Sequence, residues 1–367
     1  MRGVRIFVVF LFCCILYVAP SGASASNYES GRSLGQTAAE RAAELLEEQW
    51  DNREVIVMTN AGYARPGGVS SKGCLDGLAA ETGASVGNST LLNLQSRIDH
   101  PLWFAFYSLQ SQMCVYLQAE QDRAEDALTG QKAGEESFSL EQTARINSKY
   151  LIEHAQDFQS RIEDGLFGDN LFRVVTCANA VANNCPDDLL TAIQTHDHYC
   201  PGVTSGVFMA RFIREQILSG NSERNCFILG LDPWCKEDAL ITLLNATPGK
   251  RGYGVLYPAE DATASWPEPL DKTSTVVFLQ KDSGPWQGRM LEFDFAKVKE
   301  KFSGPQSGNS IVDKLAMDIW LIRYLDQPEV FVSELGTVEL RDGMSPKELL
   351  RPGKNPVEIL AGSESDN

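Results

Sequence analysis

The spacing of hydrophobic positions along the 367-residue chain predicts a mixture of helices and short strands. Apolar residues with a helical period mark amphipathic helices, whereas short, dense apolar runs mark strands. The helical pattern occurs at Thr37–Trp50, Leu140–Ile162, Val203–Leu218, Lys236–Leu244 and Ile311–Leu325. The strand pattern occurs at Val55–Thr59, Cys226–Leu231, Thr275–Leu279, Met290–Phe293 and Val330–Val332. A polar stretch at 129–137 separates the two halves of this pattern and is a candidate domain boundary.

The first 25 residues have the pattern of a secretory signal peptide. Arg2 and Arg5 precede an apolar run from Ile6 to Val18, and small residues lead up to a cleavage position after Ala25. We therefore expect an exported protein, periplasmic or extracellular; a retained N-terminal anchor is the alternative. No later apolar stretch has the length of a membrane span, so none is expected after cleavage.

The charge balance restricts the partners. The formal net charge is −17, and loss of Arg2 and Arg5 makes the mature chain more acidic still. Such a chain is a poor partner for nucleic acid and for anionic membranes. The sequence gives no indication of a particular small-molecule ligand.

The segment Thr195–Gly202 carries the clearest chemistry. His196, His198 and Cys200 are spaced i, i+2 and i+4, so in an extended segment their side chains share one face. Pro201 favours extended backbone at Cys200 and suits the first position of a helix. Two imidazoles and a thiolate at a helix N-terminus predict a transition-metal site.

Cys235 is the candidate fourth ligand. A helix and then a strand follow Cys200, and such a unit can bring the chain back to a position beside Cys200. A His2Cys2 set suits zinc best, with Ni²⁺, Cu²⁺ or Fe²⁺ possible as another divalent transition metal. Asp238 could orient a ligand from outside the coordination sphere. If only three side chains bind, the open position would permit Lewis-acid chemistry on bound water.

Two alternatives stay open at this point. Cys200 and Cys235 could form a disulfide, which would indicate a disulfide-stabilised extracellular binding module. The metal, or the Cys200 thiolate, could serve an enzyme that acts on a small substrate. Seven cysteines follow Ala25, an odd number, and we expect Cys177 and Cys185 to be bridged.

An internal repeat relates the two halves. One copy has Cys74, Asp76, Ser85 and Gly87, and the other has Cys235, Asp238, Thr247 and Gly249. The hydroxyl residue lies nine positions after the aspartate and the glycine eleven positions after it in both copies, whereas the cysteines match less well. The repeat predicts that the halves pack as an intramolecular pseudo-dimer; a homodimer is the other possibility.

The residues of the second copy resemble a known family. His196–Gly202, Cys235, Asp238, Thr247, Gly249 and Lys250 follow the signature of the FmdE-like family, which is named after formylmethanofuran dehydrogenase operons. That signature is an HGHxCPG segment, a CxxD helix and a TxGK turn, and here Asp197 replaces the usual glycine. The resemblance covers roughly residues 187–338, and residues 55–117 look like a degenerate copy without the histidines.

The resemblance implies an α+β fold with helices packed on small mixed sheets in two related subdomains, and it implies a bound zinc or similar ion. Methanofuran chemistry is cytoplasmic and uses a pterin cofactor in other subunits, so we do not expect an exported chain to take part in it. The expected segments are a signal peptide (1–25), a degenerate half-repeat (26–128), a linker and helical connection (129–186), a metal-binding domain (187–340) and a C-terminal tail (341–367).

Overall fold

The computed structural model describes residues 22–50, 54–220, 225–259 and 262–362, with side chains from Asn27 onward. The predicted signal peptide therefore lies outside the residues whose side chains are described. The helices are α1 (Gly22–Leu46), α2 (Gly73–Thr82), α3 (Gln121–Leu128), α4 (Ser148–Glu153), α5 (Ala155–Glu163), α6 (Leu171–Ala182), α7 (Asp187–His196), α8 (Pro201–Phe212), α9 (Lys236–Leu243), α10 (Phe295–Lys301), α11 (Ser310–Ile322) and α12 (Pro356–Leu360). None of these described helices is long and apolar enough to cross a membrane.

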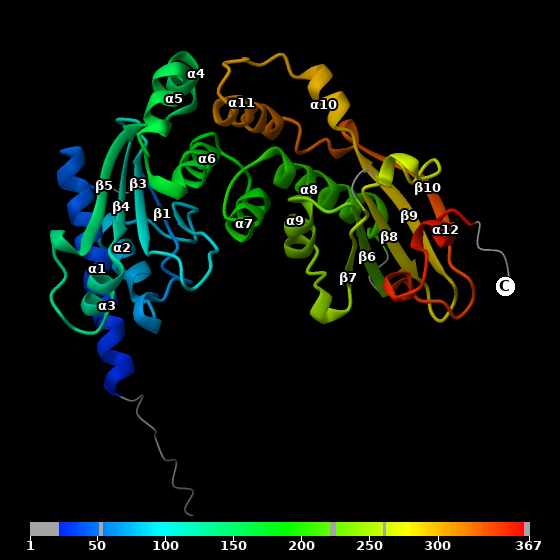
Figure 1. The fold of residues 1–367 in the computed structure, drawn as a ribbon, viewed down its shortest axis with the longest axis horizontal. Helices are drawn as coiled ribbons and strands as arrows, with labels where there is room; N and C mark the ends of the chain where they lie inside the picture. The colour runs from blue at the N-terminus through cyan, green and yellow to red at the C-terminus, as the bar shows by residue number, and fades with distance from the viewer. Residues whose placement is uncertain (1–21, 51–53, 221–224, 260–261, 363–367) are drawn as a thin grey trace, which may run out of the picture.

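The ten described strands form two five-stranded mixed sheets. The strands are β1 (Val55–Thr59), β2 (Leu91–Asn93), β3 (Trp103–Ser108), β4 (Met113–Ala119), β5 (Phe138–Arg145), β6 (Asn225–Leu231), β7 (Tyr253–Leu256), β8 (Thr275–Gln280), β9 (Trp286–Phe293) and β10 (Val332–Glu339). In Figure 1 the two sheets lie at opposite ends of the molecule, with α6 to α9 between them. The predicted fold class, helices packed on small mixed sheets, is confirmed.

The two sheets have the same strand order. The first is β2-β1-β3-β4-β5, and the second, read in the same direction, is β7-β6-β8-β9-β10. In each sheet the first pair, β1 with β2 or β6 with β7, is parallel, and the other pairs are antiparallel. Duplication of one unit would produce this arrangement, although the sequence repeat and its boundaries stay predictions.

A glycine-lined helix pair accompanies each sheet. Gly31 and Gly35 of α1 face α2, and Gly202 and Gly206 of α8 face α9. A β-carbon on Gly35 would lie 2.3 Å from the carbonyl oxygen of Cys74, and one on Gly206 would lie 2.5 Å from that of Lys236. The two helix pairs can approach this closely only because these positions carry no side chain.

The hydrophobic core is continuous between the halves. One cluster of buried side chains includes Ile56 and Met58 of β1, Val174 of α6, and Ile228 and Val277 of the second sheet. Separate smaller clusters lie on the far faces of the two sheets. The central helices therefore join the halves through a shared core.

The predicted long helix at Leu140–Ile162 is wrong. The chain there forms β5, then α4 and α5. Leu140 and Ala144 of β5 are four residues apart, and such residues share a face in a strand as well as in a helix. The apolar positions from Ile146 to Ile162 lie after β5, mostly in α4 and α5. β5 pairs along its length with β4, so strand pairing prevails up to Arg145.

Other boundaries shift by a few residues. α1 ends at Leu46, and Trp50 lies beyond it and donates a hydrogen bond to the Ala39 carbonyl. The helix expected at Val203–Leu218 is α8 followed by a π-helical turn at Ile213–Ile217. The strand expected at Val330–Val332 begins at Val332 and continues to Glu339.

Candidate metal centre

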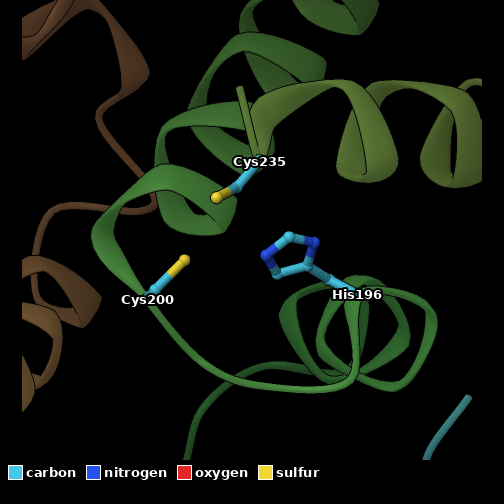
Figure 2. Close-up of side chains that lie close together, drawn as sticks. All are labelled: His196, Cys200 and Cys235. Atoms are coloured by element: carbon cyan, nitrogen blue, oxygen red, sulfur yellow. The ribbon is translucent and has the colours of Figure 1, made fainter. Parts of the chain in front are cut away.

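His196, Cys200 and Cys235 meet where three helices end or begin. His196 is the last residue of α7, Cys200 precedes the first residue of α8, and Cys235 precedes the first residue of α9. One donor atom from each lies within 4.8 Å of the other two. Figure 2 shows a ring nitrogen of His196 facing the space between the two sulfur atoms.

The backbone between His196 and Cys200 differs from the predicted extended segment. α7 continues to His196, and Asp197 adopts the left-handed region with φ 74° and ψ −8°. Cys200, which precedes Pro201, has the expected extended conformation, with φ −155° and ψ 161°. His196 and Cys200 therefore converge through a turn after a helix, and not along one face of a strand.

His198 lies beside this group but outside it. Its ring centroid is 4.3 Å from that of His196. Its Nδ1–H donates to Oδ1 of Asp197 at 2.7 Å. The predicted role of His198 as a ligand stays a prediction.

The Nε2 atom of His196 indicates that the group fits a metal ion. This atom is buried and has no hydrogen-bond partner among the described residues, which is a costly state for a polar atom. The other ring nitrogen, Nδ1, donates to Oδ2 of Asp238 at 2.7 Å. Metal-binding histidines commonly have this pattern, with a carboxylate on one nitrogen and the ion on the other.

The titration of the group favours a thiolate. The Cys200 thiol and the His196 ring lower the pKa of Cys235 to about 4, although burial opposes them. Burial alone would lower the pKa of His196, but Asp238 and Cys235 raise it to about 9. The neighbouring Cys235 and burial raise the pKa of Cys200, so the negative charge is held on Cys235.

A buried ion pair fixes the start of α9. Nζ of Lys236 lies 2.6 Å from Oε1 of Glu237 and 3.5 Å from the centre of the Trp234 ring. Oε2 of Glu237 accepts a hydrogen bond from the Trp234 backbone at 2.8 Å. The Cys235 backbone is therefore held on both sides by groups removed from solvent.

The contacts between glycines and the facing helices allow the two halves to be compared at this group. A β-carbon on Gly202 would lie 2.8 Å from Cβ of Cys235, and one on Gly31 would lie 3.2 Å from Cα of Gly73. If the halves arose by duplication, these contacts match Cys235 with Gly73 and not with Cys74. The first half would then have glycine at the position of this ligand.

The seven described cysteines are all free thiols. The bridge predicted between Cys177 and Cys185 is therefore wrong in this structure, and Cys200 and Cys235 are not bridged either. The Cys177 thiol is not directed at Cys185: its Sγ lies 4.0 Å from the carbonyl oxygen of Asp197.

Comparison with known proteins locates the family signature on these elements. Residues 195–299 match the family described as FmdE, Molybdenum formylmethanofuran dehydrogenase operon. The chain carries an FmdE domain. No curated protein matches the chain. The FmdE domain includes His196, His198, Cys200 and Cys235, but α6 and α11 lie outside it.

Sequence reasoning missed the α6 residues that contact the FmdE segment. Arg173 forms an ion pair with Asp197 at 2.8 Å, and the Phe172 ring lies 5.1 Å from that of His198. A lone arginine in an apolar helix carries no motif, so only the packing of α6 reveals these contacts.

Proposed function

We propose that this chain binds a divalent transition-metal ion, with zinc the best fit, through His196, Cys200 and Cys235 and with His198 as the fourth ligand. One observation supports this proposal above all others. Two thiols and an unpartnered, buried imidazole nitrogen lie within 4.8 Å of one another. Zinc takes sulfur and nitrogen ligands at about 2.0–2.3 Å in a tetrahedral site, so a small contraction would bring these donors into range.

The donor set also restricts the metal. Thiolates with imidazoles suit zinc, and Ni²⁺, Cu²⁺ and Fe²⁺ are the competing divalent ions. A bound ion would supply positive charge that stabilises both thiolates. The liganding residues would then connect the end of α7 with the starts of α8 and α9.

We place this function outside the cytoplasm, in the periplasm or the extracellular space. The charged, apolar and small-residue pattern of residues 1–25 supports this location. The chemistry named in the family description is not proposed for this chain, because that chemistry is cytoplasmic and the N-terminal pattern indicates export.

An enzyme that uses the bound metal or a thiolate is the alternative function. Four surface cavities among the described residues, one of them of about 410 Å³, are lined by residues outside the metal group. A disulfide-stabilised binding module is disfavoured, because the described cysteines are free thiols.

Metal analysis of the mature protein, purified without oxygen, tests the proposal. We expect about one zinc or similar ion per chain, as for a single mononuclear site. Cys200→Ser, Cys235→Ser and His196→Ala should each lose most of the metal, and His198→Ala should weaken its retention.

Two substitutions serve as matched controls. Cys226→Ser and His154→Ala change a half-buried cysteine and an exposed histidine outside the group, so both should retain the metal. Unchanged metal content in Cys200→Ser and Cys235→Ser would refute the proposed site.

A further inference from the structure

Asp197 has a backbone conformation that usually belongs to glycine. It ends α7 with φ 74°, in the left-handed region, where a β-carbon is strained. Aspartate visits this region more readily than most residues with a β-carbon, because its short polar side chain can form local hydrogen bonds.

The Asp197 carboxylate binds both the His198 imidazole and the Arg173 guanidinium group. Oδ1 accepts from Nδ1–H of His198 at 2.7 Å, and Oδ2 accepts from Nη2 of Arg173 at 2.8 Å. All three side chains are half-buried, which limits competition from water. The carboxylate thus fixes the imidazole by one nitrogen and is itself fixed by the guanidinium group.

One face of α6 supports the whole turn. Phe172 packs on the His198 ring, and Oγ1 of Thr176 accepts the Tyr199 N–H at 3.2 Å. The Cys177 S–H is directed at the Asp197 carbonyl oxygen. Together with Arg173, these residues have the i, i+1, i+4, i+5 spacing of a single helix face.

Arg173 is itself anchored towards the first sheet. Its Nη1 donates to the Asp169 carbonyl at 3.1 Å and contacts Oδ1 of Asn170 at 3.4 Å. Nδ2 of Asn170 donates to the Tyr116 hydroxyl on β4 at 2.8 Å. A chain of polar contacts therefore connects the N-terminal sheet to His198.

We propose that Arg173 and Asp197 are positioning residues that hold His198 by Nδ1 and leave its Nε2 to complete the metal site. The proposal rests on the metal-binding function proposed above. His196 has the matching arrangement, with its Nδ1 on Asp238 at 2.7 Å. Each histidine thus donates its Nδ1–H to a carboxylate. Both aspartates lie in the FmdE domain, but the Asp197 carboxylate is held by Arg173 of α6, which lies outside that domain.

Asp197→Gly gives the sharpest test, because stability and metal binding should change differently. Glycine relieves the left-handed backbone, so the metal-free variant should melt at the wild-type temperature or above. Loss of the carboxylate frees His198, and zinc affinity measured by chelator competition should fall by about 10- to 100-fold, as for other outer partners of metal ligands.

Arg173→Ala should weaken zinc binding in the same direction, and Arg173→Lys should restore part of it. Arg161→Ala is the matched control, because this exposed arginine donates to the Thr143 carbonyl outside the site. With Co²⁺ as the spectroscopic probe, the visible absorption bands of Asp197→Gly should resemble those of His198→Ala, whereas Arg161→Ala should keep the wild-type spectrum.

The outcomes separate the two proposals. Wild-type zinc affinity and a wild-type Co²⁺ spectrum in both Asp197→Gly and Arg173→Ala would overturn the positioning role while the metal site stands. A fall in affinity that is matched by unfolding of the metal-free variants would also overturn it. Absence of metal binding in the wild-type protein, or its persistence in Cys235→Ser, would instead refute the proposed function.

Discussion

Gly202 decides how closely the first turn of α8 approaches Cys235. A β-carbon at this position would lie 2.8 Å from Cβ and 3.0 Å from Sγ of Cys235. Separations this short are repulsive, so the start of α9 would have to move away. The distance between the Cys200 and Cys235 thiols therefore depends on a residue that donates nothing to the site.

Gly202→Ala should accordingly weaken zinc binding and destabilise the metal-free protein by about 1–3 kcal/mol, the usual cost of overpacking. Chelator competition and thermal unfolding measure the two effects. Gly249→Ala is the control, because its β-carbon would have only Oγ1 of Thr247 nearby, at 4.0 Å. Equal zinc affinity in both variants would contradict the role of Gly202.

At the scale of elements, α7 and α8 are connected by an ion pair remote from the metal group. Nε and Nη2 of Arg211 on α8 each donate to an oxygen of Asp188 on α7 at 2.7 Å. Both side chains are largely buried. Because His196 ends α7 and Cys200 precedes α8, this pair holds together the two helices that present them.

Asp188→Asn should destabilise the protein by about 2 kcal/mol at neutral pH, as expected for loss of charge-assisted hydrogen bonds. Burial alone would raise the pKa of Asp188, but Arg211 lowers it below its usual value. The stabilisation is therefore complete above the unfolded-state pKa of about 4 and is lost as the pH falls through the lower folded-state pKa. Denaturant unfolding of both proteins between neutral and acidic pH checks this, and a difference that persists at the lowest pH would contradict it.

The sequence predicted elements well where the local pattern allowed one interpretation. β1 matches its predicted bounds, and α9 differs by one residue. The first part of the helix expected at Leu140–Ile162 failed, because Leu140 and Ala144, four residues apart, fit a strand and a helix alike. Pairing with β4, which decides between them, is a contact between distant segments.

Sequence-based prediction has the same limit at the metal site, where contacts between distant segments decide the geometry. The HxHxC spacing and the return of the chain to Cys235 led to the three residues that come together. The turn at Asp197 was not predicted, because aspartate adopts the left-handed region only occasionally and an aspartate alone does not mark a turn. The Arg173 contact depends on how α6 packs against residues more than twenty positions away.

At the scale of the whole molecule, the two halves share one core. Buried residues of β1, α6 and the second sheet belong to a single cluster, so neither half can unfold without exposing apolar surface of the other. Figure 1 shows α6 to α9 placed between the two sheets. An intramolecular pseudo-dimer, which the internal repeat predicts, would unfold as one unit.

We therefore expect the mature protein to unfold in a single cooperative transition. Calorimetry combined with hydrogen exchange should show β3 and β8, one from each sheet, losing protection together. Two separate transitions, with β3 exposed while β8 stays protected, would show that the halves are independent.

The central claim is that both thiols and His196 bind one metal ion. X-ray absorption at the zinc edge of the metal-loaded protein tests it most directly. We predict a shell of two sulfur atoms at about 2.3 Å and nitrogen atoms at about 2.0 Å, the distances of a His2Cys2 site. In Cys235→Ser most of the bound zinc, and with it this sulfur shell, should be lost. A wild-type spectrum with only nitrogen and oxygen neighbours would contradict the account.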